Sequence, residues 1–181
     1  MFDFSRNYFE LFGLPVDYRV DLGELSLRYR ELQRVVHPDR FAAAGAHSQR
    51  LSLQSATFVN EAYAALKDPL KRAQYLLELK GAPAGEGNQT LNDPAFLMQQ
   101  MELREVLAEL RAADDPFARL DALLRDIDAM IKNETARLVV QFDDGGAAQL
   151  AAAASTIQKM QFLKKLQAEA EAVEAELEEA G

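Results

Sequence analysis

The sequence predicts an all-α protein built from two helical parts, and three observations predict it. Apolar residues recur at steps of three and four along most of the chain, which is the period of a helix with one buried face. No β-branched segment alternates with polar residues between turn signals, as a strand would. Residues 81–92, GAPAGEGNQTLN, contain three glycines and a proline and read as a linker between residues 1–80 and 93–181.

Composition narrows the class of protein. Hydrophobic residues make up 49% and charged residues 27%, which permits a packed core. The absence of cysteine excludes disulfides and thiolate nucleophiles. The first residues do not have the basic start and apolar run of a signal peptide, and no stretch approaches the roughly 18 apolar residues of a membrane helix. We therefore expect a cytoplasmic protein that does not bind membranes.

Charge is divided unevenly between the two parts. Residues 1–80 hold 11 Lys and Arg against 10 Asp and Glu, whereas residues 81–181 hold 9 against 19. Such asymmetry favours two parts with different partners. It argues against nucleic acid as a ligand of the second part, because that part would repel phosphate.

The first part should contain four helices. RNYFELFG forms a short helix that ends at Gly13, and helices follow over 21–36 and about 48–66. Residues 37–46 join the last two, which predicts an antiparallel hairpin. Asp68 and Pro69 then begin a fourth helix as cap and first residue. The predicted core stripes of the hairpin are Leu22, Leu25, Tyr29, Leu32 and Val36 on one helix, and Leu51, Ser55, Phe58, Ala62 and Leu66 on the other.

The second part should contain three antiparallel helices. The same Asp-Pro start recurs at 93–94 and 115–116, which predicts helices over 93–113 and 115–142. DDGG at 143–146 ends the second, and an alanine-rich helix continues to about 178. The predicted core stripes are Phe96, Leu103, Val106, Leu107 and Leu110 on the first helix, and Ile157, Met160, Leu163, Leu166, Ala170, Val173 and Leu177 on the last.

Some apolar residues of the second part fall outside these stripes. Leu97, Met98 and Met101 lie on the other side of their helix. Glu102 and Glu105 border them, and Phe162 is off the stripe of the last helix. The patch is either buried against another helix or the first part, or it binds another protein, for which methionines are well suited.

The tripeptide His37-Pro38-Asp39 ends a helix rich in arginine. As a bare tripeptide it reads as a helix stop, because proline disfavours α geometry in the residue before it. Catalysis is the weakest interpretation, since His37 and Asp39 are too close in sequence to form a general-base pair and no serine elbow or phosphate-cradling loop is present. A metal site would need further ligands, and His47 is the one other histidine. We therefore expect no catalytic residue, no metal ligand and no cofactor.

The surroundings of the tripeptide change its interpretation. YFELFGLP, then HPD after a basic helix, then NEAYAALKDPLKRAQYLL, in this order and spacing, resemble the J domain of DnaJ-type co-chaperones. The resemblance implies that His37, Pro38 and Asp39 dock on a DnaK-type chaperone and accelerate its ATP hydrolysis. It also implies a positive surface that steers this contact, formed by Arg28, Arg30, Arg34 and Arg40, the last at a position where relatives commonly carry lysine.

The second part carries its own resemblance. DPAFLMQQMELREVL at 93–107 and KMQFLKKL at 159–166 resemble the C-terminal three-helix domain of the HscB family, the J-type co-chaperones of iron–sulfur cluster assembly. This implies an L-shaped, bacterial-type adaptor whose partners are the chaperone HscA and the cluster scaffold protein IscU. The implied scaffold contacts are Leu97, Met98, Met101, Glu102, Glu105 and Phe162, with Met101 where relatives often have leucine.

Two other interpretations stay open at this point. The bundle of a J-domain adaptor could serve a different client, which would leave the chaperone contact intact. Alternatively, the chain could be a helical structural protein in which HPD is only a helix stop. The sequence also leaves the oligomeric state open between a monomer and a weak dimer.

Overall fold

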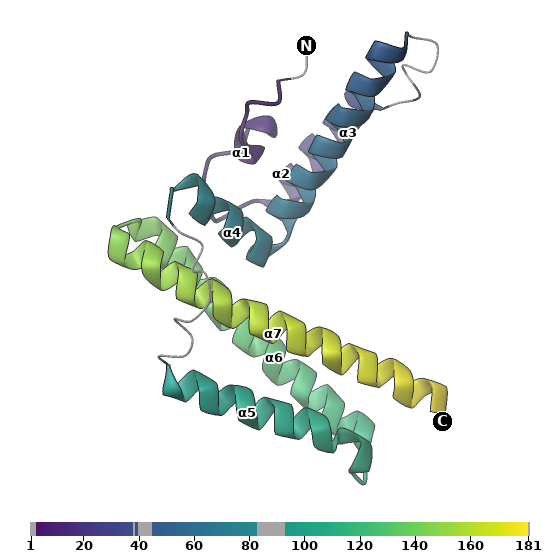
Figure 1. The fold of residues 1–181 in the computed structure, drawn as a ribbon, viewed down its shortest axis with the longest axis vertical. Coiled ribbons are helices and arrows are strands. Elements are labelled where there is room, and N and C mark those ends of the chain that lie inside the picture. Colours follow the sequence, from purple (N-terminus) through teal and green to yellow (C-terminus); the bar gives the residue numbers. More distant parts are fainter. Residues whose placement is uncertain (1–2, 38, 40–44, 83–92, 181) are drawn as a thin grey trace. The chain divides into compact units, whose positions relative to one another are not determined.

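The computed structural model describes residues 3–37, 39, 45–82 and 93–180, and within these ranges all regular structure is helical (Figure 1). The predicted all-α fold is thereby confirmed. The chain divides into two compact units, Met1–Leu76 and Leu77–Gly181. Most of the predicted linker, residues 83–92, lies outside the described residues. No described helix is both long enough and apolar enough to cross a membrane.

The N-terminal unit is centred on a helical hairpin. Its helices are α1 (Tyr8–Leu11), α2 (Leu22–Val36), α3 (Ala46–Lys67) and the start of α4 (Pro69–Leu79). Helices α2 and α3 lie side by side, as predicted, and α1 packs on α3 (Figure 1). The largest side chains of its core are fully buried, namely Phe9, Leu25, Leu66 and Leu76.

The ends of these helices follow from local chemistry. Asn7 and Glu10 form a reciprocal capping box at α1, and Gly13 reverses the chain after α1 with a φ of 64°. Asp21 accepts the backbone N–H groups of Gly23 and Glu24 at the start of α2. One core prediction was wrong here. Leu22 is 48% exposed, because it is the first residue of α2 and lies at the very end of the stripe.

The C-terminal unit contains the three predicted long helices. They are α5 (Pro94–Glu109), which continues as the 3₁₀ turn η3 (Leu110–Ala112), α6 (Pro116–Asp144) and α7 (Ala147–Ala180). Gly145 ends α6 in the left-handed conformation, with a φ of 66°. Six buried side chains of α6 form the centre of the core, namely Leu120, Leu123, Ile127, Ile131, Leu138 and Phe142.

All three Asp-Pro starts work as predicted. The carboxylates of Asp68, Asp93 and Asp115 each accept the backbone N–H of the residue three positions later, at 2.9, 3.1 and 3.0 Å. The proline that follows each of them needs no hydrogen-bond partner at the first helical position. These short signals place the beginnings of α4, α5 and α6.

Candidate protein-binding sites

The end of α2 exposes a histidine and an aspartate beside each other. The backbone N–H of Asp39 donates a hydrogen bond to Nδ1 of His37 at 3.3 Å, and Oδ2 of Asp39 lies 3.6 Å from the same nitrogen. The side chain of Asp39 is 89% exposed, so its carboxylate is accessible to a partner. Pro38 and Arg40 lie outside the described residues.

A serine on the opposite helix holds the end of α2 in place. Oγ of Ser52, which is buried, donates a hydrogen bond of 2.7 Å to the carbonyl oxygen of Val36. The last carbonyls of a helix have no partner within the helix, and Ser52 supplies one immediately before His37. Sequence reasoning missed this residue, since a serine in a helical stripe gives no sign of which carbonyl it reaches.

The predicted arginines project from the exposed side of α2. Arg28 lies between two acidic neighbours, with nitrogens 3.5 Å from Glu24 and 3.8 Å from Glu31. Nε of Arg30 donates to the carbonyl oxygen of Ser26 at 3.2 Å, and Arg34 is exposed in the last turn. Arg30 and Arg34 lie nearer the end of α2, whereas the charge of Arg28 is partly offset by its two glutamates.

Aromatic and amide side chains hold α2 against α3. The rings of Tyr29 and Tyr63 stack with centroids 4.0 Å apart. The hydroxyl of Tyr29 donates to Asn60 Oδ1 at 3.0 Å, and Gln33 donates to the same oxygen. This polar contact stiffens the helix that carries the arginines, because each donor meets a fixed acceptor on the neighbouring helix.

The off-stripe patch on α5 reaches the surface. Met98 and Met101 are 63% and 72% exposed, Glu102 and Glu105 are also exposed, and Leu97 is half-buried. The two methionines are therefore not packed against another helix of the bundle. On the other side of α5, Phe96 and Leu103 are buried as predicted.

Phe162 is not turned away from the bundle. It is half-buried, and its ring meets that of Phe96 edge to face with centroids 5.7 Å apart. The guanidinium of Arg104 lies over the same ring at 5.5 Å and forms an ion pair of 3.6 Å with Glu169. The expectation that Phe162 points off the core is corrected, because α5 packs along this edge of α7 and covers part of the ring.

Side-chain pairs also show how α5 lies on α7. Asp93 contacts Lys159, Phe96 contacts Phe162, and Arg104 contacts Glu169. Residue numbers rise together in all three pairs, so α5 and α7 run in the same direction. Helix α6 connects them and runs the opposite way, which confirms the predicted three-helix arrangement (Figure 1).

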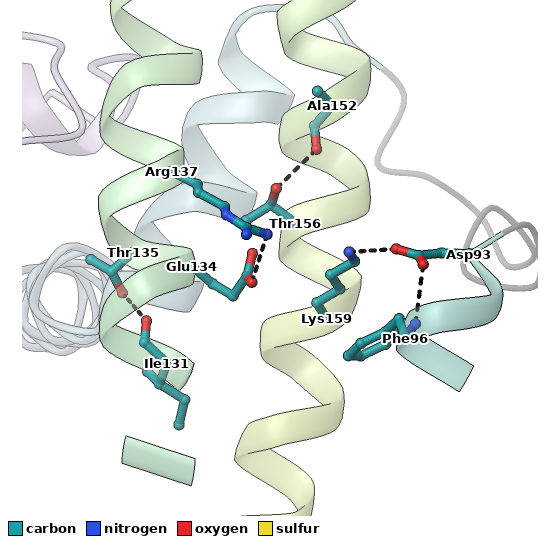
Figure 2. A network of polar contacts seen from close by, with 9 residues as sticks. All are labelled: Asp93, Phe96, Ile131, Glu134, Thr135, Arg137, Ala152, Thr156 and Lys159. Carbon is teal, nitrogen blue, oxygen red and sulfur yellow. Dashed lines mark hydrogen bonds and ion pairs between the residues drawn. The ribbon is translucent and has the colours of Figure 1, made fainter. Parts of the chain in front are cut away.

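The first of these pairs combines two interactions on one carboxylate (Figure 2). Oδ2 of Asp93 lies 2.6 Å from Nζ of Lys159, while Oδ1 accepts the N–H of Phe96. The hydrogen bond from Lys159, followed by that from the Phe96 amide, lowers the pKa of Asp93. Lys159 also lies over the Phe96 ring, 5.1 Å from its centroid. The Asp-Pro signal predicts the cap, but it does not predict the lysine on a helix 66 residues away.

Comparisons with known proteins agree with both halves of this description. The family model of the HSCB C-terminal oligomerisation domain matches residues 92–171. A co-chaperone protein HscB homolog from Shewanella amazonensis is 45% identical over 93% of this chain and 97% of its own length. Chaperone HscB from Vibrio cholerae has a TM-score of 0.83 at 45% identity, over 95% of this chain and 99% of that one. Human co-chaperone protein HscB has a TM-score of 0.86 at 31% identity, over 95% and 84%.

A helical hairpin whose first helix ends beside His37 and Asp39, together with these likenesses, defines a J-domain co-chaperone. The likeness to the Shewanella and Vibrio proteins runs through both units and covers nearly the full length of each. The chain belongs to the HscB family of co-chaperones.

Proposed function

We propose that this chain binds the iron–sulfur scaffold protein IscU, brings it to the DnaK-type chaperone HscA, and stimulates ATP hydrolysis by that chaperone in the bacterial cytoplasm. Membership of the HscB family supports the general role of co-chaperone. The observation that carries the more specific proposal is the pair of exposed methionines on α5 bordered by glutamates, because grouped and adaptable apolar side chains with a polar rim suit a protein-binding surface. In this proposal the iron–sulfur cluster is carried by IscU, and this chain binds IscU rather than the cluster.

The J domain acts through Asp39 and the arginines of α2. An exposed carboxylate held beside His37 offers a strong, oriented acceptor to a cationic group of the chaperone. Arg28, Arg30 and Arg34 of α2 attract an acidic surface and speed the encounter. Arg40, which lies outside the described residues, is proposed to add to this charge. His37 lies beside this carboxylate, and we propose that it takes part in the contact together with Pro38.

The bundle acts through the exposed side of α5. Met98 and Met101 supply apolar surface that adapts to the shape of a partner, with Leu97 beside them. Glu102 and Glu105 form an acidic border that selects a client with basic residues around an apolar centre. Phe162 of α7 is half-buried beside Phe96 and Arg104, and we propose that its exposed part adds to this contact.

Joining the two sites in one chain gives the function. A client held on α5 is at high effective concentration near a chaperone held by the J domain. ATP hydrolysis is then triggered while the client is present, which favours its capture. An adaptor for a different client would also bind the chaperone through its J domain but would not bind IscU through α5.

The experiment is the steady-state ATP turnover of HscA at a fixed concentration of this chain, with IscU titrated in. We expect the chain to raise turnover and IscU to raise it further. Asp39→Ala should abolish both effects, whereas the same substitution at the exposed Asp126 of α6 should change neither. Replacing Met98 and Met101 with alanine should remove the amplification by IscU alone, and Val140→Ala, also exposed on α6, serves as the matched control.

Each outcome separates the two halves of the proposal. Stimulation that depends on Asp39 but is indifferent to IscU would keep the J-domain contact and reject the client. No stimulation by the unaltered chain would reject the chaperone contact as well.

A further inference from the structure

Helix α5 carries the proposed scaffold surface but is held to its unit by few contacts. It buries two side chains, Phe96 and Leu103, whereas six are buried on α6. A helix with little buried apolar area depends more strongly on individual side-chain contacts for its position. At the beginning of α5 these contacts converge on one residue, Asp93 (Figure 2).

Asp93 links the first turn of α5 to α7. Its Oδ1 accepts the N–H of Phe96 at 3.1 Å, and its backbone oxygen accepts the N–H of Leu97 at 3.0 Å. Its second carboxylate oxygen is bound by Lys159 at 2.6 Å. Any movement of Asp93 away from α7 therefore carries Leu97 and Met98 with it, because both lie within one and a half turns of the cap.

The side chain of Lys159 is partly buried and has two neighbours that fix its position. Its side chain is only 20% exposed, and its ammonium group lies between the Asp93 carboxylate and the ring of Phe96. A partly buried ion pair is less screened by solvent and salt than an exposed one. Lys132 of the same unit differs in its exposure. It also lies 2.6 Å from an aspartate, Asp128, but its side chain is 75% exposed and both residues belong to one helix.

We propose that Lys159 is a positioning residue, which through Asp93 holds the first turn of α5 in the place where Leu97 and Met98 meet the scaffold protein. The role rests on the proposed function, since it concerns the same surface. Lys159 need not touch the scaffold protein itself, and its effect passes through the cap of α5.

The test uses Lys159→Met in the full chain, with Lys132→Met as its matched control. Both remove one lysine charge from an ion pair of the same length. We expect Lys159→Met to weaken IscU binding, measured by calorimetry, about fivefold, the factor that corresponds to about 1 kcal/mol. Lys132→Met should leave the affinity unchanged. Lys159→Arg keeps the charge and should restore most of the affinity.

A second variant tests whether the effect passes through Asp93. Asp93→Asn keeps a good capping side chain and removes the charge that Lys159 binds. The single variants and the Asp93→Asn, Lys159→Met double variant should all lose about the same factor, because each breaks the same pair. Hydrogen exchange of the Phe96 and Leu97 amides, measured without any partner, should be faster in Lys159→Met and unchanged in Lys132→Met.

The outcomes distinguish the two proposals. Failure of the unaltered chain to bind IscU would reject the proposed function. Normal binding by Lys159→Met, or weaker binding with unchanged amide exchange, would reject the positioning role, and the second result would instead indicate direct contact between Lys159 and the scaffold protein. Losses that multiply in the double variant would also overturn the inference.

Discussion

The hydrogen bond from Ser52 to Val36 provides the sharpest test of how the J domain is held together. Replacing Ser52 with alanine removes a buried Oγ that lies 2.7 Å from the last carbonyl oxygen of α2. The carbonyl then has no helical partner at its position, and Pro38, two residues later, has no N–H to offer. Ser55→Ala is the matched control on the same helix, because Ser55 is equally buried but donates at 2.8 Å to Leu51, a carbonyl within α3 itself.

The two substitutions should differ clearly in cost. A buried polar group left without a partner costs about 1–3 kcal/mol, so we expect Ser52→Ala to lower the free energy of unfolding by that amount. Ser55→Ala removes a second hydrogen bond from a carbonyl that its own helix already satisfies, and we expect a loss of about 0.5 kcal/mol or less. Ser52→Ala should also reduce stimulation of the chaperone, because the end of α2 carries His37 and Asp39.

Tyrosine fluorescence makes this measurement specific to one unit. All five tyrosines lie between residues 8 and 75, and the chain has no tryptophan. Unfolding in urea followed by this signal therefore reports the N-terminal unit. With a slope of about 1 kcal/mol per molar urea, the expected loss lowers the midpoint for Ser52→Ala by about 1 M or more. Equal midpoints for Ser52→Ala and Ser55→Ala would refute the argument that Ser52 satisfies an otherwise unpartnered carbonyl.

Three further predictions follow from other contacts. Because folding lowers the pKa of Asp93, its ionised form adds stability above the ordinary pKa of 3.8, and this stability is lost as the pH falls through the lower pKa of the folded state. The unfolding midpoints of the unaltered chain and Lys159→Met, followed by far-UV circular dichroism, should therefore become equal at low pH. A difference that persists there would contradict the ion pair as its source. Gly145→Ala places a side chain on a residue with a φ of 66°, which should destabilise the C-terminal unit by about 1–2 kcal/mol. Urea unfolding followed at 222 nm measures this loss, and no change would mean that the turn relaxes freely. Burial lowers the pKa of Arg72, whose Nη1 donates to the Leu66 carbonyl oxygen at 2.7 Å. Arg72→Met should lower the free energy of unfolding of the N-terminal unit, followed by tyrosine fluorescence, by about 1–3 kcal/mol. An unchanged midpoint would show that this carbonyl finds another donor.

Much of the fold could be predicted because its signals are local. An aspartate followed by proline needs only the next three residues to form a cap, and the three examples at 68, 93 and 115 all do so. Helical periodicity likewise identified the buried face of α7, where Met160, Leu163 and Leu166 are fully enclosed. Periodicity gives the direction of a side chain but not the neighbour it meets. Leu22 was therefore placed in the core, and the end of α5 was drawn as one helix rather than a 3₁₀ turn.

The candidate sites were predictable as positions on helices and less so as contacts. Met98 and Met101 were placed on the outer side of α5, and both are exposed. Phe162 was misjudged because its cover comes from Phe96 and Arg104 on a distant segment. The supports of both sites, Ser52 beneath the end of α2 and Lys159 beside the cap of α5, act across helices, and no spacing within one helix reveals them.

The same-direction packing of α5 and α7 has a consequence for synthesis on the ribosome. Asp93 is synthesised 66 residues before its partner Lys159, and Phe96 is synthesised equally long before its partner Phe162. At translation rates of about 5–20 residues per second, α5 exists for roughly 3–13 s before its partners on α7 are made, with α6 as the one long helix of the described unit made in between. We expect the hairpin of α6 and α7, joined by two glycines, to close through nearby residues and so to complete the surface on which α5 packs. The first of these three helices to be made is then the last to complete its packing.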